Sequence, residues 1–387
     1  MVSSPFSSDS SEAVASRLAA LAASGVVIVD PRQTYVAPDV DLRRIHSGAV
    51  LCPGTRLSGP RCWLGAGAEV GTEGPASIVD CVLDEQARVC SGYASGAVLL
   101  RGASLGANCH VRGGTVLEEE ASTAHAVGLK QTILLSFVTL GSLINFCDCL
   151  MAGGTSRRDH SEVGSGYIHF NFTPWGERGD KATPSLVGSV PRGVFLRERR
   201  IFLGGTGGLV GPACVGFGAV AGAGQVLRGG IRENRLVLSP PRAVDREIVP
   251  GYKDEAAPRA LLNIHYVAEL FALREWYRQV RRTTVPAPRR AVIEAAAENL
   301  DVCIAEREKQ LSRFLIERRV EPLRFSLDDP PPCPFVIDEA EADHVAWVHR
   351  LSDEEVAAGT QWLEQIVSLV ADPAREALGA GAARTPS

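Results

Sequence analysis

An aliphatic residue recurs at every sixth position between residues 203 and 227. These positions hold Leu203, Leu209, Val215, Ala221 and Leu227. Glycine follows three of them directly. A period of six fits neither an amphipathic helix nor an alternating strand, because these repeat about every 3.6 and every 2 residues. It is typical of a solenoid of short strands, in which the aliphatic side chains point to the axis and glycine lets the chain turn at each corner.

The same period occurs in two earlier runs. One holds Leu51, Leu57 and Trp63, and the other holds Leu99, Leu105, Val111 and Leu117. Coils of this kind bury a core only by stacking on one another, so we expect one continuous prism with three strands per turn. We therefore predict a mainly β protein in three parts: an N-terminal helix and linker over residues 1–45, a hexapeptide-repeat solenoid over 46–250, and an α-helical region over 251–380.

Apolar residues return to helical spacing after about residue 250. Helices are predicted over 256–282, 289–319 and 339–377, and a short amphipathic helix is predicted over 11–23. The C-terminal helices have two candidate roles. They cap the open end of the solenoid, where an uncovered strand edge would invite aggregation, or they bind a protein partner. Capping is the role that we favour.

Charge and composition argue against some classes of protein. The chain of 387 residues carries a formal net charge of −5, which disfavours nucleic-acid and membrane-surface partners. It shows no signal-like leader and no long apolar run, so we expect a soluble, cytoplasmic protein. The ten cysteines form no CxxC pair, and we interpret them as reduced, buried side chains rather than metal ligands.

Two pairs of residues at fixed spacing resemble one enzyme family. Arg112 is followed by Gly-Gly and, eighteen residues on, by Lys130; Asn171 is followed by Lys181. Together with the segment 25–31, these resemble the C-terminal acetyltransferase half of the bifunctional bacterial enzyme that makes UDP-N-acetylglucosamine. The resemblance runs from about residue 25 to residue 242. It implies a left-handed parallel β-helix and a homotrimer with active sites between neighbouring prisms. We expect no uridylyltransferase domain.

The resemblance also implies roles for single residues. The family holds a sugar 1-phosphate with an Arg and a Lys at this spacing, which points to Arg112 and Lys130. A planar guanidinium and a compact ammonium suit a phosphate dianion. Asn171 and Lys181 would contact the sugar, and Asn145 stands where the family has a Tyr. Solvated surface charges and a turn-forming Asn are the alternatives.

Acetyl-coenzyme A is the donor that the resemblance implies. Ser165, Gly205 and Ala223 match family positions that contact it, mostly through backbone groups along the edge of a coil. The family's cofactor-binding Arg is missing here, because the chain continues with Pro240 after Ser239, and Arg242 is the expected substitute. Corners that only shape the backbone are the alternative.

The family's general base is replaced. Ser142 stands where the family has a His, twelve residues after Lys130, and a hydroxyl group is not basic enough to take a proton from an ammonium. General-base catalysis typically contributes about 10²–10⁴-fold, so another group must act if the reaction survives. His160, in an insertion, and His169, which would share a strand face with Asn171, are the candidates. Surface or structural imidazoles are the alternatives.

These observations predict an acyltransferase-like protein that moves an acyl group from acetyl-coenzyme A to an amino-sugar phosphate or a nucleotide sugar. The alternative is a catalytically inactive sugar-nucleotide-binding or scaffold protein of the same fold. A zinc enzyme of the β-helix carbonic-anhydrase type is less favoured, and we expect no metal. Its pattern has two His five residues apart, which is not found among His110, His125, His160 and His169.

Overall fold

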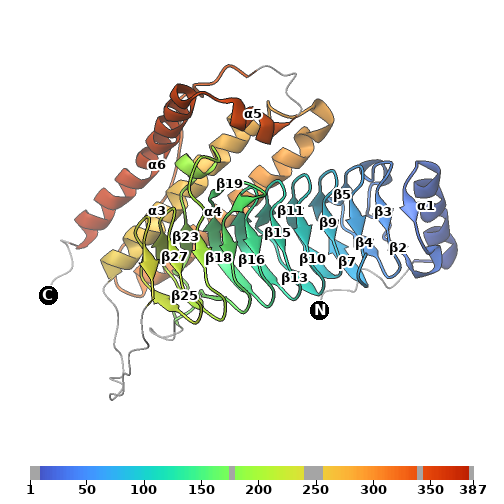
Figure 1. Ribbon diagram of the computed structural model, residues 1–387, viewed down its shortest axis with the longest axis horizontal. Helices are drawn as coiled ribbons and strands as arrows, with labels where there is room; N and C mark the ends of the chain where they lie inside the picture. The colour runs from blue at the N-terminus through green and yellow to red at the C-terminus, as the bar shows by residue number, and fades with distance from the viewer. Residues whose placement is uncertain (1–8, 174–178, 239–255, 338–342, 383–387) are drawn as a thin grey trace, which may run out of the picture.

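The computed structural model describes residues 9–173, 179–238, 256–337 and 343–382. Its main body is a parallel β-helix, and helices lie along one side of it (Figure 1). The predicted fold class is therefore confirmed. Each full coil contributes one short strand to each of three faces, which we call A, B and C in chain order. The first coil begins at Val27, inside the segment that the sequence assigns to a linker.

Face A is an 11-stranded parallel sheet. Its strands are β1 (Val27–Ile28), β3 (Val50–Leu51), β6 (Glu69–Val70), β9 (Arg88–Val89), β12 (Ser104–Leu105), β15 (Ser122–Thr123), β17 (Thr139–Leu140), β21 (Glu162–Val163), β24 (Phe202–Leu203), β27 (Val220–Ala221) and β29 (Leu236–Val237).

Faces B and C form one 16-stranded sheet, because β16 (Gly128–Leu134) and β18 (Asn145–Met151) run from face B into face C. The other strands of face B are β2 (Tyr35–Val36), β4 (Arg56–Ser58), β7 (Ala76–Val79), β10 (Gly92–Ser95), β13 (Cys109–Val111), β22 (Ile168–Phe170), β25 (Gly208–Val210) and β28 (Val226–Arg228). Those of face C are β5 (Trp63–Leu64), β8 (Val82–Leu83), β11 (Ala97–Leu99), β14 (Thr115–Leu117), β23 (Ser185–Val187) and β26 (Ala213–Val215). Outside the prism, β19 (Gly154–Ser156) and β20 (Asp159–His160) pair as an antiparallel hairpin.

The six-residue period marks the interior of the prism. Leu203, Leu209 and Val215 lie on faces A, B and C of one coil, and each is at most 2% exposed. Stacking them on their counterparts in neighbouring coils builds the core, as predicted. Trp63 is one position out of register. It pairs with Val82 on the outer side of face C, and Leu64 takes the inward position instead.

The outer side of face C is apolar, which the six-residue period does not predict. One register-aligned column on this face consists of Val82, Val98, Val116, Ile133, Leu150 and Leu186, all at most 2% exposed. On face A the corresponding outward positions of β6, β9, β12 and β15 are polar. A sheet that is apolar on both sides must be covered, and in this chain the C-terminal helices cover it.

The C-terminal helices form a layer over one side of the prism (Figure 1), and α4 lies directly against face C. They are α3 (Ala256–Glu275), which continues through a π-helical segment (Trp276–Arg281), α4 (Arg290–Ile316), α5 (His344–Arg350) and α6 (Asp353–Ala382). α4 packs on β8, β11 and β14, and α6 packs on α3 and on the short α2 (Val190–Gly193). The favoured end-capping role is therefore wrong for these helices. The N-terminal helix α1 (Ser11–Ala23) instead packs on β1 and β2 of the first coil.

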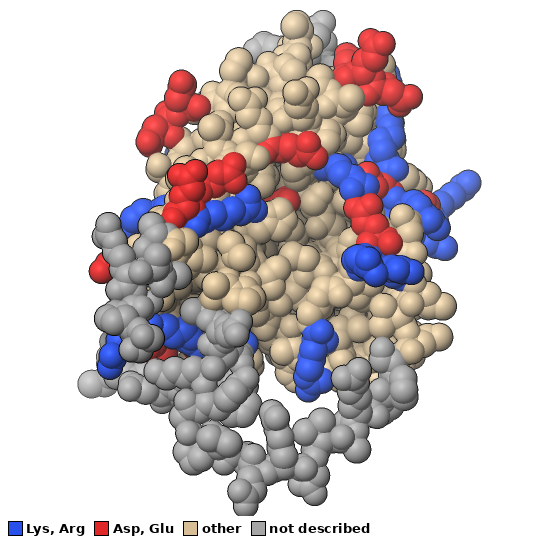
Figure 2. All heavy atoms as spheres, turned by 90° about the vertical axis from the view of Figure 1, so that its left-hand side faces the viewer, with Lys and Arg blue, Asp and Glu red and all other residues tan. Residues whose placement is uncertain are grey.

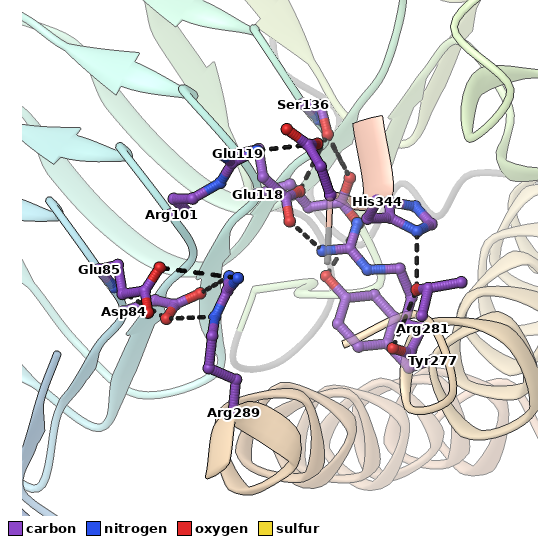
Figure 3. Close-up of polar contacts among 12 residues, drawn as sticks. Asp84, Glu85, Arg101, Glu118, Glu119, Ser136, Tyr277, Arg281, Arg289 and His344 are labelled. Atoms are coloured by element: carbon purple, nitrogen blue, oxygen red, sulfur yellow. Dashed lines mark hydrogen bonds and ion pairs between the residues drawn. The ribbon is translucent and has the colours of Figure 1, made fainter. Parts of the chain in front are cut away.

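Buried ion pairs fasten the helices to the prism (Figure 3). Arg289 reaches Asp84 with both Nε (3.0 Å) and Nη2 (2.5 Å). Arg281 reaches Glu119 at 2.5 Å, and the Tyr277 hydroxyl donates to Glu118 at 2.8 Å. Burial raises the pKa of Glu118, and the charge of Arg281 opposes that rise. Removing one partner of such a pair leaves an uncompensated buried charge, so these contacts define where the helices sit.

Figure 2 shows acidic and basic side chains interspersed over one end of the molecule. Within the described ranges, no helix combines the length and apolar character needed to cross a membrane.

Candidate functional site

Arg112 and Lys130 lie in adjacent coils at the edge between faces B and C. The backbone N–H of Arg112 donates to the carbonyl of Leu129 at 2.9 Å, and Lys130 pairs in register with Cys147 of the next coil. Both cations act on the Cys147 thiol: burial raises its pKa, and the positive charges of Arg112 and Lys130 oppose the rise, with a hydrogen bond from Arg112 as well. Both side chains therefore lie near the Cys147 thiol, in one register-aligned column.

A glycine interrupts the outward column of face B beside this pair. Gly128 occupies the outward column between His110 and Asn145. A Cβ built on Gly128 would lie 3.5 Å from Asn145 Oδ1 and 3.9 Å from the His110 carbonyl, which are ordinary contacts. Asn145 is exposed, and its Oδ1 is 3.7 Å from Cys147 Sγ. The missing side chain thus leaves space on the face between two polar residues.

The opposite edge of face B brings together four residues that the sequence assigned to catalysis and donor binding. These residues stack in consecutive coils, in the order Ser142, Ser165, Gly205 and Ala223. In each step, the residue after the next member of the column donates its N–H to the carbonyl of the preceding member, at 2.7–2.9 Å. The Ser142 hydroxyl also donates to Ser165 Oγ at 3.0 Å. None of these four residues has a side chain larger than that of Ser. Arg242, the expected substitute for the family Arg, lies outside the described residues.

His169 does not face the ligand side, contrary to the expectation from strand alternation. It is 2% exposed and lies inside the prism, paired in register with Leu209. Its Nδ1 contacts the Cys147 carbonyl at 2.5 Å, and its Nε2 contacts Ser185 Oγ at 2.8 Å. Burial lowers its pKa to about 4. Both ring nitrogens are occupied, so the structure gives this residue the role of a core histidine.

His160 lies far from Ser142 along the coil. It belongs to the β19–β20 hairpin at the edge between faces C and A, whereas Ser142 lies between faces A and B. Its Nδ1 contacts the Arg157 carbonyl at 3.0 Å. Burial lowers its pKa, and the charge of Arg157 adds to the effect. It borders a groove with Arg199, Arg200 and Phe202 on face A, so the structure does not bring it to the Arg112–Lys130 pair.

Asn171 and Lys181 lie next to an antiparallel bridge between Thr173 and Asp180, after β22. The Asn171 amide donates to Asp148 Oδ2 at 2.9 Å. Two backbone hydrogen bonds of 3.0 and 2.9 Å form the bridge. Lys181 is exposed and lines a small pocket with α4, so its side chain lies against the helical region. Trp175, Glu177 and Arg178 lie outside the described residues.

His125 is a residue that the sequence reasoning did not place at the site. The Leu143 N–H donates to the His125 carbonyl at 3.1 Å, which places His125 one coil before Ser142 in the edge column. The His125 side chain is exposed. The signal was available, since His125 and Ser142 are seventeen residues apart, which is about one coil. Among the described residues, no group of three or more His, Cys, Asp or Glu side chains is placed to hold a metal ion.

The fold and these edges define a hexapeptide-repeat β-helix protein with a two-cation corner. No family model matches the chain. Among curated proteins it is similar to the bifunctional protein GlmU of Fervidobacterium nodosum (28% identity over 224 residues, 58% of this chain and 44% of that protein), Nocardia farcinica (29% over 216 residues, 56% and 38%) and Mycolicibacterium gilvum (27% over 242 residues, 61% and 43%).

The matches confirm the resemblance to the C-terminal half of GlmU. The chain spans less than half the length of these relatives. A solved Bacillus cereus structure, the product of the BC4754 gene, covers 73% of this chain and 98% of its own, with 12% identity and a TM-score of 0.13. That score carries no weight for fold or function.

Proposed function

We propose that the solenoid binds an amino-sugar phosphate or a nucleotide sugar and transfers an acyl group to it from acetyl-coenzyme A. The observation that carries the proposal is the alignment of Arg112 and Lys130 in adjacent coils near the Cys147 thiol, beside Gly128. Two cations at one corner suit a phosphate dianion. The side-chain-free Gly128 would let a sugar ring approach face B, and the exposed Asn145 next to it offers a hydrogen-bonding amide.

In this proposal each edge of face B binds a different substrate. With the phosphate at the Arg112–Lys130 edge, a sugar laid across the face directs its amine toward the edge that carries Ser142. The small side chains of Ser165, Gly205 and Ala223 leave space there for the thioester. In the transfer, the amine nitrogen forms a bond to the thioester carbonyl, the carbon–sulfur bond breaks, and coenzyme A leaves as the thiol. Backbone N–H donors at this edge would stabilise the tetrahedral oxyanion.

The proton lost by the amine needs an acceptor, and Ser142 is a poor one. We assign this role to His125, which lies one coil before Ser142 in the same edge column and has an exposed side chain. An imidazole is the most common general base in proteins. Replacing it by Gln is expected to reduce turnover about 10²-fold or more while leaving sugar-phosphate affinity unchanged.

The test measures binding and turnover separately. Isothermal titration with glucosamine 1-phosphate and with UDP-N-acetylglucosamine, and thiol release from acetyl-coenzyme A, are compared for the wild type, Arg112→Ala and Lys130→Ala. Each variant should weaken sugar-phosphate binding about tenfold or more, because each removes a charge-assisted contact. Arg88→Ala, an exposed Arg on face A, is the matched control. Equal affinity in all four proteins would refute the phosphate site.

The placement of the two candidate histidines favours a second function, that of a non-catalytic sugar-nucleotide-binding protein. His169 is buried with both nitrogens occupied, and His160 lies at another edge. If the wild type binds a sugar phosphate but releases no thiol and shows no thermal shift with acetyl-coenzyme A, this second function replaces the first.

A further inference from the structure

Arg307 of α4 is buried where the helical region meets the proposed sugar-phosphate site. It is 3% exposed. Its Nη2 lies 2.9 Å from Asp148 Oδ1 and donates to Gln131 Oε1 at 3.3 Å. Its Nη1 donates to the Lys181 carbonyl at 3.3 Å. One guanidinium therefore contacts two corners of the prism, in consecutive coils, and the end of the loop after β22.

Two of these partners are one step from a residue that the sequence assigned to the ligand, and the third, Lys181, is itself such a residue. Asp148 accepts a hydrogen bond from the Asn171 amide with its other oxygen, at 2.9 Å. Gln131 directly follows Lys130 in the chain. Lys181 offers its own carbonyl. Three of the residues expected to bind the sugar phosphate are thus linked to Arg307, although the sequence places Arg307 in a different region of the chain.

Two of the partners also have backbone conformations that need support. Gln131 has φ 47° and Asp148 has φ 60°, in the left-handed region that residues other than glycine adopt at a cost. Both sit at the corner where β16 and β18 turn from face B to face C. The Arg307 guanidinium donates to the Gln131 side chain and forms an ion pair with the Asp148 carboxylate. It thereby holds these corners in place, and with them the outward direction of the residues beside them, Lys130 and Cys147.

We propose that Arg307 is a positioning residue of the ligand site, so that α4 forms part of the site rather than only a cover for face C. For the identity of the ligand, a phosphorylated sugar, this rests on the proposed function. The fork geometry is essential, because a Lys has one point charge in place of several donors in one plane. The charge also matters: without it, the buried Asp148 carboxylate would lie unneutralised beside the phosphate corner.

Arg289 provides a matched control. It also joins the helical region to the prism through a buried carboxylate, Asp84, but it has no contact with a residue of the proposed site. A purely structural role predicts that variants of Arg307 and Arg289 behave alike. A positioning role predicts that only variants of Arg307 change ligand affinity and the order of the segments 168–173 and 179–185.

The experiment uses the full chain as the wild type, Arg307→Lys, Arg307→Gln, Arg289→Lys and Arg289→Gln. Affinities for glucosamine 1-phosphate and UDP-N-acetylglucosamine are measured by titration, and amide hydrogen exchange is followed in peptides covering 168–173 and 179–185. We expect both Arg307 variants to weaken binding about tenfold and to speed exchange in these peptides. Arg289 variants should lower the melting temperature without either effect.

The outcomes separate this proposal from the proposed function. If Arg307→Lys binds like the wild type and exchanges like it, the positioning role is overturned. If the wild type binds neither sugar, the proposed function fails, and hydrogen exchange still decides whether Arg307 orders the loop. Arg307→Lys keeps the buried charge, so it remains informative if Arg307→Gln does not fold.

Discussion

Glu269 on α3 makes the stability of the protein depend on pH in an unusual direction. Its side chain is 2% exposed. Oε2 accepts a hydrogen bond from the Val190 N–H at 2.6 Å, and Oε1 lies 3.6 Å from His265 Nε2. Burial raises the pKa of Glu269 from 4.5 to about 8, and Glu364 adds to the rise. Burial also lowers the pKa of His265, so burial disfavours the charged form of both side chains.

The sign follows from proton binding. Between pH 4.5 and 8 the folded state keeps a proton on Glu269 that the unfolded state has released. Stability contributed by this group is therefore complete below pH 4.5 and is lost as the pH rises, by about 1.4 kcal/mol per pH unit and about 4 kcal/mol by pH 8. Glu269→Gln keeps a neutral acceptor for Val190 and removes the dependence.

Denaturant unfolding of the wild type and Glu269→Gln at pH 5, 6.5 and 8 measures this effect. The two proteins should have similar stability at pH 5, and the variant should be more stable by several kcal/mol at pH 8. Glu376→Gln, at an exposed position on α6, controls for loss of one carboxylate. The buried His169 and His344 have lowered pKa values and act in the opposite direction, but they are present in all three proteins. A stability difference that does not change between pH 5 and pH 8 would refute the reasoning.

Three further predictions concern the site and the covered face. Alkylation of Cys147, followed by mass spectrometry, should be slower than that of a free thiol at pH 7 and still rising above pH 9, because burial raises its pKa; the rate of a free thiol at pH 7 would contradict this. Gly128→Val should change the free energy of unfolding by about 1 kcal/mol or less and abolish sugar-phosphate binding, because the added side chain would stand where the sugar is proposed to approach face B; unchanged binding in titrations would count against this placement of the sugar. Leu150→Ala should destabilise the fold by about 2–5 kcal/mol, although Leu150 points out of the prism. The control Ser104→Ala, at an outward position of face A, should change stability by about 0.5 kcal/mol or less. Equal effects of the two substitutions in denaturant unfolding would show that face C is not covered.

The solenoid could be predicted because its rule is local. An inward aliphatic residue at each strand and a tight corner after it repeat within six residues, so a short stretch such as 203–227 reveals the whole architecture. The sequence also indicates that face C is covered, because its strands contain pairs of adjacent apolar residues such as Val98-Leu99 and Val116-Leu117. Two apolar neighbours on a strand imply that both sides are buried, and this signal predicts a helical layer along the prism.

The site was predictable where it depends on coil length and not where it depends on strand direction. Arg112 and Lys130 are about one coil apart, so stacking brings them together. His169 is the middle residue of β22, between the outward Ile168 and Phe170, and must point inward. Alternation does not carry on to Asn171, because the strand ends at Phe170. The link through Arg307 depends on tertiary packing of α4, which no local pattern reports.

The covered face also bears on the expected homotrimer. The resemblance implies active sites completed by a neighbouring prism. In this chain, the groups from outside the prism that lie against the proposed corner come from α4: Cys303 Sγ donates to the Gly114 carbonyl at 3.1 Å, and Arg307 contacts Gln131 and Asp148. A tethered helix is present at a high effective concentration. A site completed by α4 would therefore bind sugar phosphate equally well at any protein concentration, whereas a site completed by a second prism would lose affinity on dilution below the dissociation constant of the assembly.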